Sequence, residues 1–150
     1  PWHLEYIRFG HGPEALIAFH GFDNDAEDWK IFEGALGDRY TLYCINLFYH
    51  GNSHIDYGHE GDFDRKTLSS VFGKILETFG LQRFSLIGFS LGGRICLELL
   101  CDYADRIDRV YLLAADGLYA RLHRMQQAAA PADTAQSVHD AAGASFPNGV

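Results

Sequence analysis

Positively charged residues and long apolar runs are both scarce in this sequence. Its 150 residues include 12 Lys and Arg against 20 Asp and Glu, which gives a net charge of -8. This balance argues against a nucleic-acid backbone or an anionic membrane surface as the main partner, because both attract clustered Lys and Arg. No run reaches the roughly 18 apolar residues that a membrane-spanning helix needs. We therefore expect no nucleic acid and no membrane as a partner.

Cysteine is also rare, with three residues and no Cys-x-x-Cys spacing. Cys44 lies in an apolar run, and Cys96 and Cys101 are five residues apart on an expected helix, where they do not share a face. We interpret all three as small buried residues in a reducing compartment, not as a disulfide or metal site. No signal peptide is recognisable after Pro1, and we expect a cytoplasmic location.

Apolar residues, in contrast, make up 47% of the chain, enough for a packed core in one domain. Short apolar runs typical of buried strands alternate with segments of helical periodicity. The expected strands are Leu4–Phe9, Ala15–Phe19, Tyr40–Leu47, Phe84–Phe89 and Arg109–Ala115, and the expected helices are Asp25–Leu36, Thr67–Phe79, Leu91–Asp105 and one that begins at Leu118–Arg124. This alternation predicts an α/β protein with a mostly parallel sheet flanked by helices.

The strongest chemical signal is a Gly-x-Ser-x-Gly pattern, Gly88-Phe89-Ser90-Leu91-Gly92, between an expected strand and an expected helix. A sharp strand-to-helix turn needs glycine on both sides of the serine, because a Cβ there would clash with neighbouring backbone. Such a turn holds the serine hydroxyl out at the carboxyl end of the sheet, above a helix N-terminus that favours negative charge. The alternative interpretation is an ordinary glycine-rich turn with an exposed serine.

Four landmarks in chain order make the sequence resemble the α/β-hydrolase superfamily. They are His20-Gly21-Phe22 at that family's oxyanion loop, residues 46–53 at its Asp-x-x-Gly-x-Gly-x-Ser segment, residues 88–93 at its nucleophile elbow, and residues 112–117 at the strand before its cap insertion. The second landmark departs from the family, with Asn46 where Asp is common and with Gly51 as its single glycine where two are usual.

The resemblance implies a mechanism in which Ser90 attacks an acyl carbon and the backbone N–H groups of Phe22 and Leu91 hold the oxyanion. His20 and Gly21 would support that loop, His20 through hydrogen bonds and not as a base. No metal or organic cofactor is required. We expect hydrolysis of a small or medium-sized carboxylic ester, neutral or cationic. Carbon–carbon lyase, thioesterase, amidase or acyltransferase chemistry and a non-catalytic binding module remain alternatives.

The catalytic base and acid are harder to identify, because the family order is serine, then acid, then histidine. After Ser90 the histidines are His123 and His139, and neither follows an expected strand. Asp116 follows an expected strand and is a candidate acid, although an Asp-Gly turn that enters the cap is the interpretation we favour. The catalytic histidine is therefore not identified, and we expect this chain to be an incomplete hydrolase that is inactive alone.

No apolar strand follows Ala115, and the composition changes near residue 125, after which there are eight alanines and no Lys or Arg. We therefore expect residues 1–124 to form the N-terminal part of the hydrolase core, with the elbow and the start of the cap. Residues 125–150 are expected to be an Ala-rich tail that is disordered or unlike the family. A core that ends after its sixth strand would leave a sheet edge through which copies could associate.

Two further polar clusters have simpler explanations than metal binding. The acids of the first cluster are expected at a helix start, and those of the second belong to a surface loop that matches no zinc pattern. The first comprises Asp23, Asp25, Glu27 and Asp28, and the second comprises His50, His54, His59, Asp56, Asp62 and Asp64.

Overall fold

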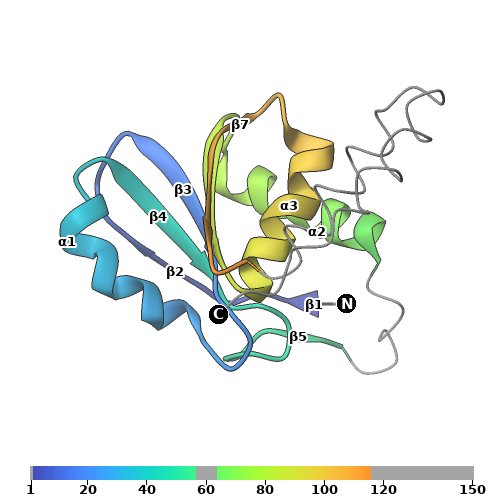
Figure 1. Cartoon of the computed structure of the whole chain (residues 1–150). Helices are drawn as coiled ribbons and strands as arrows, with labels where there is room; N and C mark the ends of the chain where they lie inside the picture. The colour runs from blue at the N-terminus through green and yellow to red at the C-terminus, as the bar shows by residue number, and fades with distance from the viewer. Residues whose placement is uncertain (1, 57–63, 116–150) are drawn as a thin grey trace, which may run out of the picture. The chain divides into compact units, whose positions relative to one another are not determined.

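The computed structural model describes residues 2–56 and 64–115, which belong to a compact unit, Pro1–Asp116 (Figure 1). A five-stranded sheet has the order β2-β4-β3-β6-β7. Its strands are β2 (Tyr6–Phe9), β3 (Glu14–Phe19), β4 (Tyr40–Ile45), β6 (Phe84–Phe89) and β7 (Ile107–Leu113). Only β2 runs antiparallel to its neighbour, so the prediction of a mostly parallel sheet is confirmed. The predicted boundary between residues 124 and 125 lies outside the described residues.

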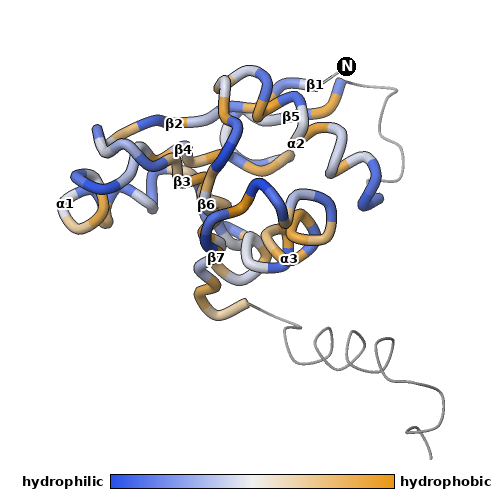
Figure 2. The backbone as a smooth tube through the Cα atoms, turned by 90° about the horizontal axis from the view of Figure 1, so that it is seen from above, coloured by the Kyte–Doolittle hydropathy of each residue, from blue (hydrophilic) through white to orange (hydrophobic). Residues whose placement is uncertain are grey.

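Helices cover both faces of this sheet, as the alternating sequence pattern predicts (Figure 1). The 3-10 helix η1 (Ala26–Phe32) and α1 (Glu33–Leu36) lie on one face, and α2 (Arg65–Phe79) and α3 (Leu91–Tyr103) lie on the other. Apolar residues gather along β3 and β4 in the middle of the sheet (Figure 2). The α/β class and the helix-flanked sheet are therefore confirmed.

Strand β3 shows how the sequence builds two cores at once. Its side chains alternate between the faces, so Ile17 and Phe19 pack with the α2 and α3 side, while Leu16 and Ala18 pack with η1. All four are buried. Burying a Leu, Ile or Phe side chain fully contributes about 1.5–3 kcal/mol, so continuous apolar runs stabilise a strand covered on both faces.

The helix ends follow from their capping residues. Asp64 begins α2, because its carboxylate accepts a hydrogen bond from the Thr67 backbone N–H at 2.8 Å, and Gly80 ends it in a left-handed conformation with φ 67°. The Asp25 carboxylate likewise accepts from the Glu27 N–H at 2.8 Å and caps η1. The first acidic cluster thus lies at a helix start, as predicted.

Two details differ from the sequence-based expectation. Cys44 and Cys96 are buried, but Cys101 is exposed, so the prediction for Cys101 was wrong. Five residues turn a helix by about 140° beyond a full turn, so a buried Cys96 places Cys101 on the outer side of α3. The segment expected to be only a loop also contains β5 (His54–Ile55), which pairs antiparallel with β1 (Trp2–His3).

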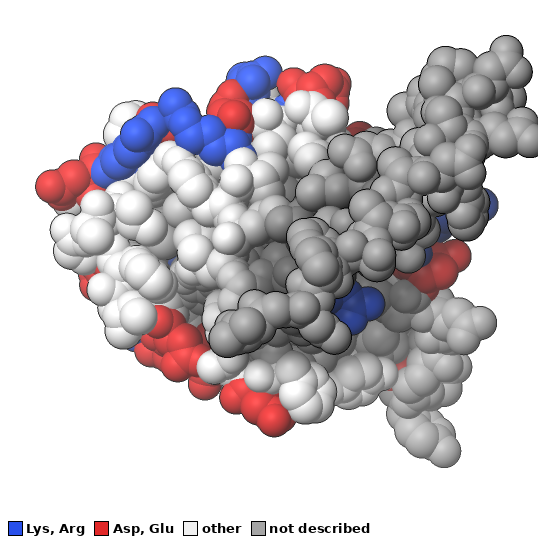
Figure 3. Space-filling view, in the orientation of Figure 1, with Lys and Arg blue, Asp and Glu red and all other residues white. Residues whose placement is uncertain are grey.

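Charges of both signs lie along the margin of the face in Figure 3, with mostly uncharged atoms between them. The Glu14 carboxylate, for example, pairs with the side chains of Arg39 at 3.1 Å and Arg109 at 2.8 Å. Such exposed pairs contribute little to stability, because water and salt screen them. No helix among the described residues has the length and apolar character needed to cross a membrane.

Candidate active site

Ser90 occupies the turn between β6 and α3 in a backbone conformation that is unusual for a residue with a side chain. Its φ is 49° and its ψ is -111°, and its N–H donates to the Leu113 carbonyl at 2.9 Å. A non-glycine residue in such a region costs about 1–3 kcal/mol and persists where the surrounding structure enforces it. The strand, sharp turn and helix expected around the Gly-x-Ser-x-Gly pattern are therefore all present.

The two glycines of the pattern have no room for a side chain. A Cβ on Gly88 would lie 2.3 Å from the Gly92 carbonyl oxygen, and a Cβ on Gly92 would lie 2.0 Å from the Phe19 carbonyl oxygen. Both obstacles are backbone atoms, which cannot rotate away. Glycine at these positions lets α3 begin directly against β3 and β6.

His20 follows β3 and is buried, with both ring nitrogens engaged. Its Nε2 accepts a hydrogen bond from the Leu47 N–H at 3.0 Å, so Nδ1 carries the proton and donates to the Gly21 carbonyl at 2.7 Å. Burial, the largest cause, lowers the pKa of His20. A neutral ring with both nitrogens engaged can hold the loop in place but has no free nitrogen to act as a base.

The two predicted oxyanion donors come from neighbouring strands. Phe22 follows β3 and Leu91 follows β6, and because these strands are parallel neighbours, both loops emerge at the same edge of the sheet. Leu91 is the first residue of α3, where a backbone N–H has no partner within the helix. The Phe22 side chain is 71% exposed. The oxyanion role of these N–H groups stays a prediction.

His50 is the site residue that the sequence analysis missed, because it was assigned to a surface loop. Its ring centroid lies 4.8 Å from that of His20 and 6.0 Å from that of Phe22. Its Nδ1–H donates to the Phe48 carbonyl at 3.1 Å. The signal that could have identified it in the sequence is its place within the 46–53 segment that resembles the family. No group of three or more His, Cys, Asp and Glu among the described residues could hold a metal ion.

The contacts of Asn46 give a reason for Asn at a position where the family commonly has Asp. Its Oδ1 accepts from the Ala26 N–H at the start of η1, at 2.7 Å, while its Nδ2 donates to a Glu5 carboxylate oxygen at 2.6 Å. An Asp could accept the first bond but could not donate the second. Hydrogen bonds from the Asn52 backbone and side chain, with a further one from Asn46, lower the pKa of Glu5.

Two cavities flank Ser90. One, of about 490 Å³, is lined by Phe19, His50 and Leu91 among others. The other, of about 430 Å³, is lined by His20, Gly21, Trp29 and Phe89 among others. Both volumes fall within the 300–1,000 Å³ typical of ligand pockets. The residues before and after Ser90 in the chain therefore border different cavities.

The candidate acid and base lie outside the part of the chain that the structure describes. Asp116, His123 and His139 all belong to this group, and so does the expected helix at Leu118–Arg124. What the structure does bring together is the elbow, the loop after β3 and His50.

Known proteins share both sequence and fold with this chain. It is 29% identical over 100 residues to a fluoroacetate dehalogenase of Burkholderia sp, covering 65% of this chain and 33% of the relative. It is 28% identical over 108 residues to a pimeloyl-[acyl-carrier protein] methyl ester esterase of Aeromonas hydrophila, covering 72% and 40%. The solved structure of a thermophilic esterase from Thermogutta terrifontis matches with a TM-score of 0.64 and 22% identity, covering 74% and 40%.

These similarities cover much of this chain but a smaller share of each relative. The chain spans between 33% and 40% of the length of the two curated relatives. The family described as alpha/beta hydrolase fold matches residues 14–143, which include the loop after β3 and the turn at Ser90. The chain belongs to the alpha/beta hydrolase fold family.

Proposed function

We propose that this chain carries the nucleophile and the oxyanion-binding part of a serine hydrolase that cleaves carboxylic esters. The observation that carries the proposal is the strained backbone of Ser90, with φ 49° at the N-terminus of α3. A glycine would adopt that turn at lower cost, so a serine there is best explained by the use of its hydroxyl. The esterases among the similar proteins support the same reaction class.

The proposed reaction has two steps. The Ser90 oxygen forms a bond to the acyl carbon, the bond from that carbon to the alkoxy oxygen breaks, and the serine proton passes through a base to the departing alcohol. A water oxygen then forms a bond to the acyl carbon, the bond from that carbon to the Ser90 oxygen breaks, and one water proton passes through the base to the Ser90 oxygen, so that the carboxylic acid leaves and the serine hydroxyl is restored. Backbone N–H donors at Phe22 and Leu91 would stabilise the oxyanion, each worth about 100- to 1,000-fold in rate.

The base is a separate question, because the hydrogen bonds of His20 engage both of its ring nitrogens. We propose His123 and His139, the histidines that follow Ser90 in the chain, as the residues to test. Asp116 stays the candidate acid.

Labelling with a fluorophosphonate probe tests the proposal directly. The proposal predicts labelling that depends on Ser90: whatever label the wild-type chain and a Ser70→Ala variant take up should be absent from Ser90→Ala, since Ser70 lies on the exposed side of α2. A p-nitrophenyl ester assay on the same three proteins should follow the same order. His123→Ala and His139→Ala then show which histidine the labelling needs. Folded wild-type protein that takes up no label would show that Ser90 is not activated in this chain.

A further inference from the structure

The larger of the two cavities beside Ser90 has walls suited to an apolar chain. It lies between α2, α3 and the segment that follows β4, and its volume is about 490 Å³. Most of the lining side chains are apolar and buried or half-buried; they include Phe19, Leu47, Leu68, Val71, Phe72 and Ile95. Water in such a space makes few hydrogen bonds, so an apolar ligand that displaces it is favoured.

This cavity borders the helix start that follows the candidate catalytic turn. Leu91, the residue directly after Ser90, forms part of the wall, and so does His50, whose ring contacts those of His20 and Phe22. A hydrocarbon chain bound in the cavity would therefore lie beside Leu91, one residue from Ser90 in the sequence.

Tyr49 lies on the wall of the cavity in a conformation that disfavours a large side chain. Its φ is 67°, in the left-handed region, where a non-glycine residue costs about 1–2 kcal/mol. Its side chain is 68% exposed, so burial does not offset that cost. This is also the position at which the resemblance leads one to expect a second glycine. Residues held in strained backbone conformations cluster at active sites and ligand clamps.

The charged residues at the cavity favour a ligand without a negative end group. Asp64 and Glu98 line it together with Arg65, and the guanidinium of Arg65 is already paired with the carboxylate of Asp102. Because the Arg65 guanidinium is already paired, it is not available to a carboxylate brought into the cavity, and the two carboxylates on the wall, those of Asp64 and Glu98, would repel such a carboxylate. A neutral chain has no such cost.

We propose that this cavity binds the neutral hydrocarbon chain of an ester's acyl group and that Tyr49 is a specificity-determining residue for that chain. That the bound hydrocarbon chain belongs to the acyl group of an ester rests on the proposed function. Binding of a hydrocarbon chain in the cavity does not itself require the reaction. Substrate class and catalysis can therefore be tested separately.

Calorimetric titration of the full chain with three amides tests the proposal. We expect octanamide to bind at least about ten-fold more tightly than acetamide, because several more methylene groups leave water. The analogue of octanamide with a terminal carboxylate should bind at least about ten-fold more weakly than octanamide itself, because the carboxylates of Asp64 and Glu98 on the cavity wall repel it. Equal affinities for octanamide and acetamide, or for the neutral and carboxylated chains, would overturn the proposal.

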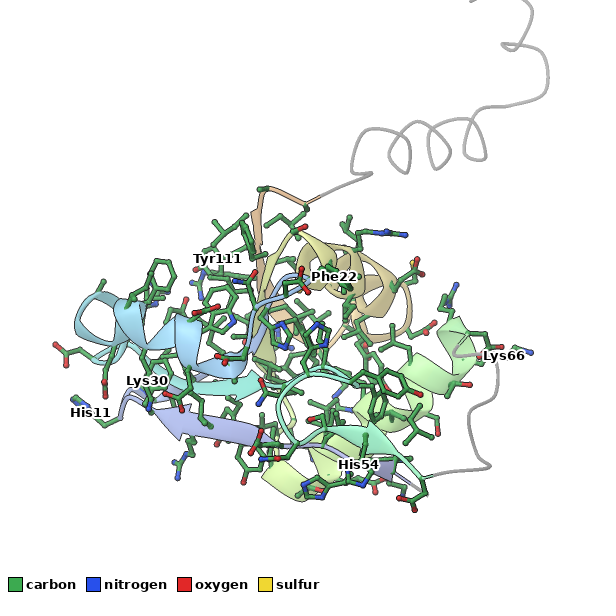
Figure 4. All side chains as sticks on the ribbon, turned by 90° about the horizontal axis from the view of Figure 1, so that it is seen from below. His11, Phe22, Lys30, His54, Lys66 and Tyr111 are labelled. Atoms are coloured by element: carbon green, nitrogen blue, oxygen red, sulfur yellow. The ribbon has the colours of Figure 1, made fainter. Side chains whose placement is uncertain are left out.

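Substitutions locate the bound chain. Leu68→Trp fills the cavity and should lower the octanamide affinity about ten-fold or more, whereas Lys66→Trp adds the same ring two residues away on the exposed side of α2 and should leave it unchanged (Figure 4). If Leu68→Trp unfolds, Ile95→Phe is the second variant. Unchanged affinity in a folded cavity-filling variant would overturn the site.

Tyr49→Gly separates a ligand contact from a structural role. We expect it to weaken octanamide binding while the free energy of unfolding stays equal or rises, because glycine relieves the positive φ. Tyr49→Phe should retain binding. Ser90→Ala should bind octanamide like the wild type, because binding of the hydrocarbon chain does not need the serine hydroxyl. If the wild type binds octanamide but takes up no fluorophosphonate label, only the proposed reaction is refuted. Labelling without preference for the longer chain would refute only the cavity assignment.

Discussion

Among single residues, Asn46 shows most clearly how one atom changes what the fold accepts. We expect Asn46→Asp to lower the free energy of unfolding by about 1–3 kcal/mol. The buried side chain at position 46 would lose the N–H that donates to Glu5, and its new carboxylate would face the carboxylate of Glu5. Urea unfolding of the wild type and the variant at pH 7 measures this difference. The bond at the start of η1 should survive, because an Asp oxygen at position 46 can still accept from the Ala26 N–H.

In the matched control, residue 5 instead of residue 46 supplies the N–H donor of the hydrogen bond between them. In a Glu5→Gln/Asn46→Asp double variant the new amide at position 5 can donate to the new carboxylate at position 46, so the stability should return toward that of Glu5→Gln alone. A double variant as unstable as the sum of the two single variants would show that the Glu5–Asn46 bond does not carry the effect.

Among the elements, the contact between α3 and the sheet depends on missing side chains. Gly92→Ala would place a Cβ 2.0 Å from the Phe19 carbonyl oxygen, so α3 would have to move away from β3. We expect a loss of about 1–3 kcal/mol or more in unfolding free energy. Gly34→Ala in α1 is the control, because no atom lies within 4 Å of its added Cβ, and it should stabilise by about 0.5–1 kcal/mol. Similar losses in both variants would contradict the steric argument.

Periodicity predicted the elements that depend on it and missed those that do not. Helix α2 was predictable from its apolar spacing and from Gly80, and β3 from its apolar run. The two-residue strands β1 and β5 were not, because two residues have no period and their pairing joins segments about 50 residues apart. The turn at Ser90 was predictable from strand and helix order. The contact of His50 with His20 was not, because it depends on how two loops pack.

At the scale of the whole molecule, four groups in the described part of the chain make folding depend on pH in the same direction. Burial lowers the pKa of His20, and hydrogen bonds or an ion pair lower those of Glu5, Asp64 and Asp102. Each binds its proton more readily in the unfolded chain, so its contribution to stability is complete above its unfolded pKa and is lost as the pH falls through its folded pKa.

The order of these losses gives the last prediction. The usual pKa is 6.5 for His20, against 4.5 for Glu5 and 3.8 for the two Asp residues, so stability should begin to fall below pH 6.5 and fall more steeply below about 4.5. Urea unfolding at about pH 7.5, 6, 5 and 4, values that bracket these pKa values, measures the free energy of unfolding at each pH. His20→Gln should remove the fall between pH 6.5 and 5, whereas His11→Gln, on an exposed histidine, should retain it. An unchanged slope in His20→Gln would assign the acid sensitivity to another group.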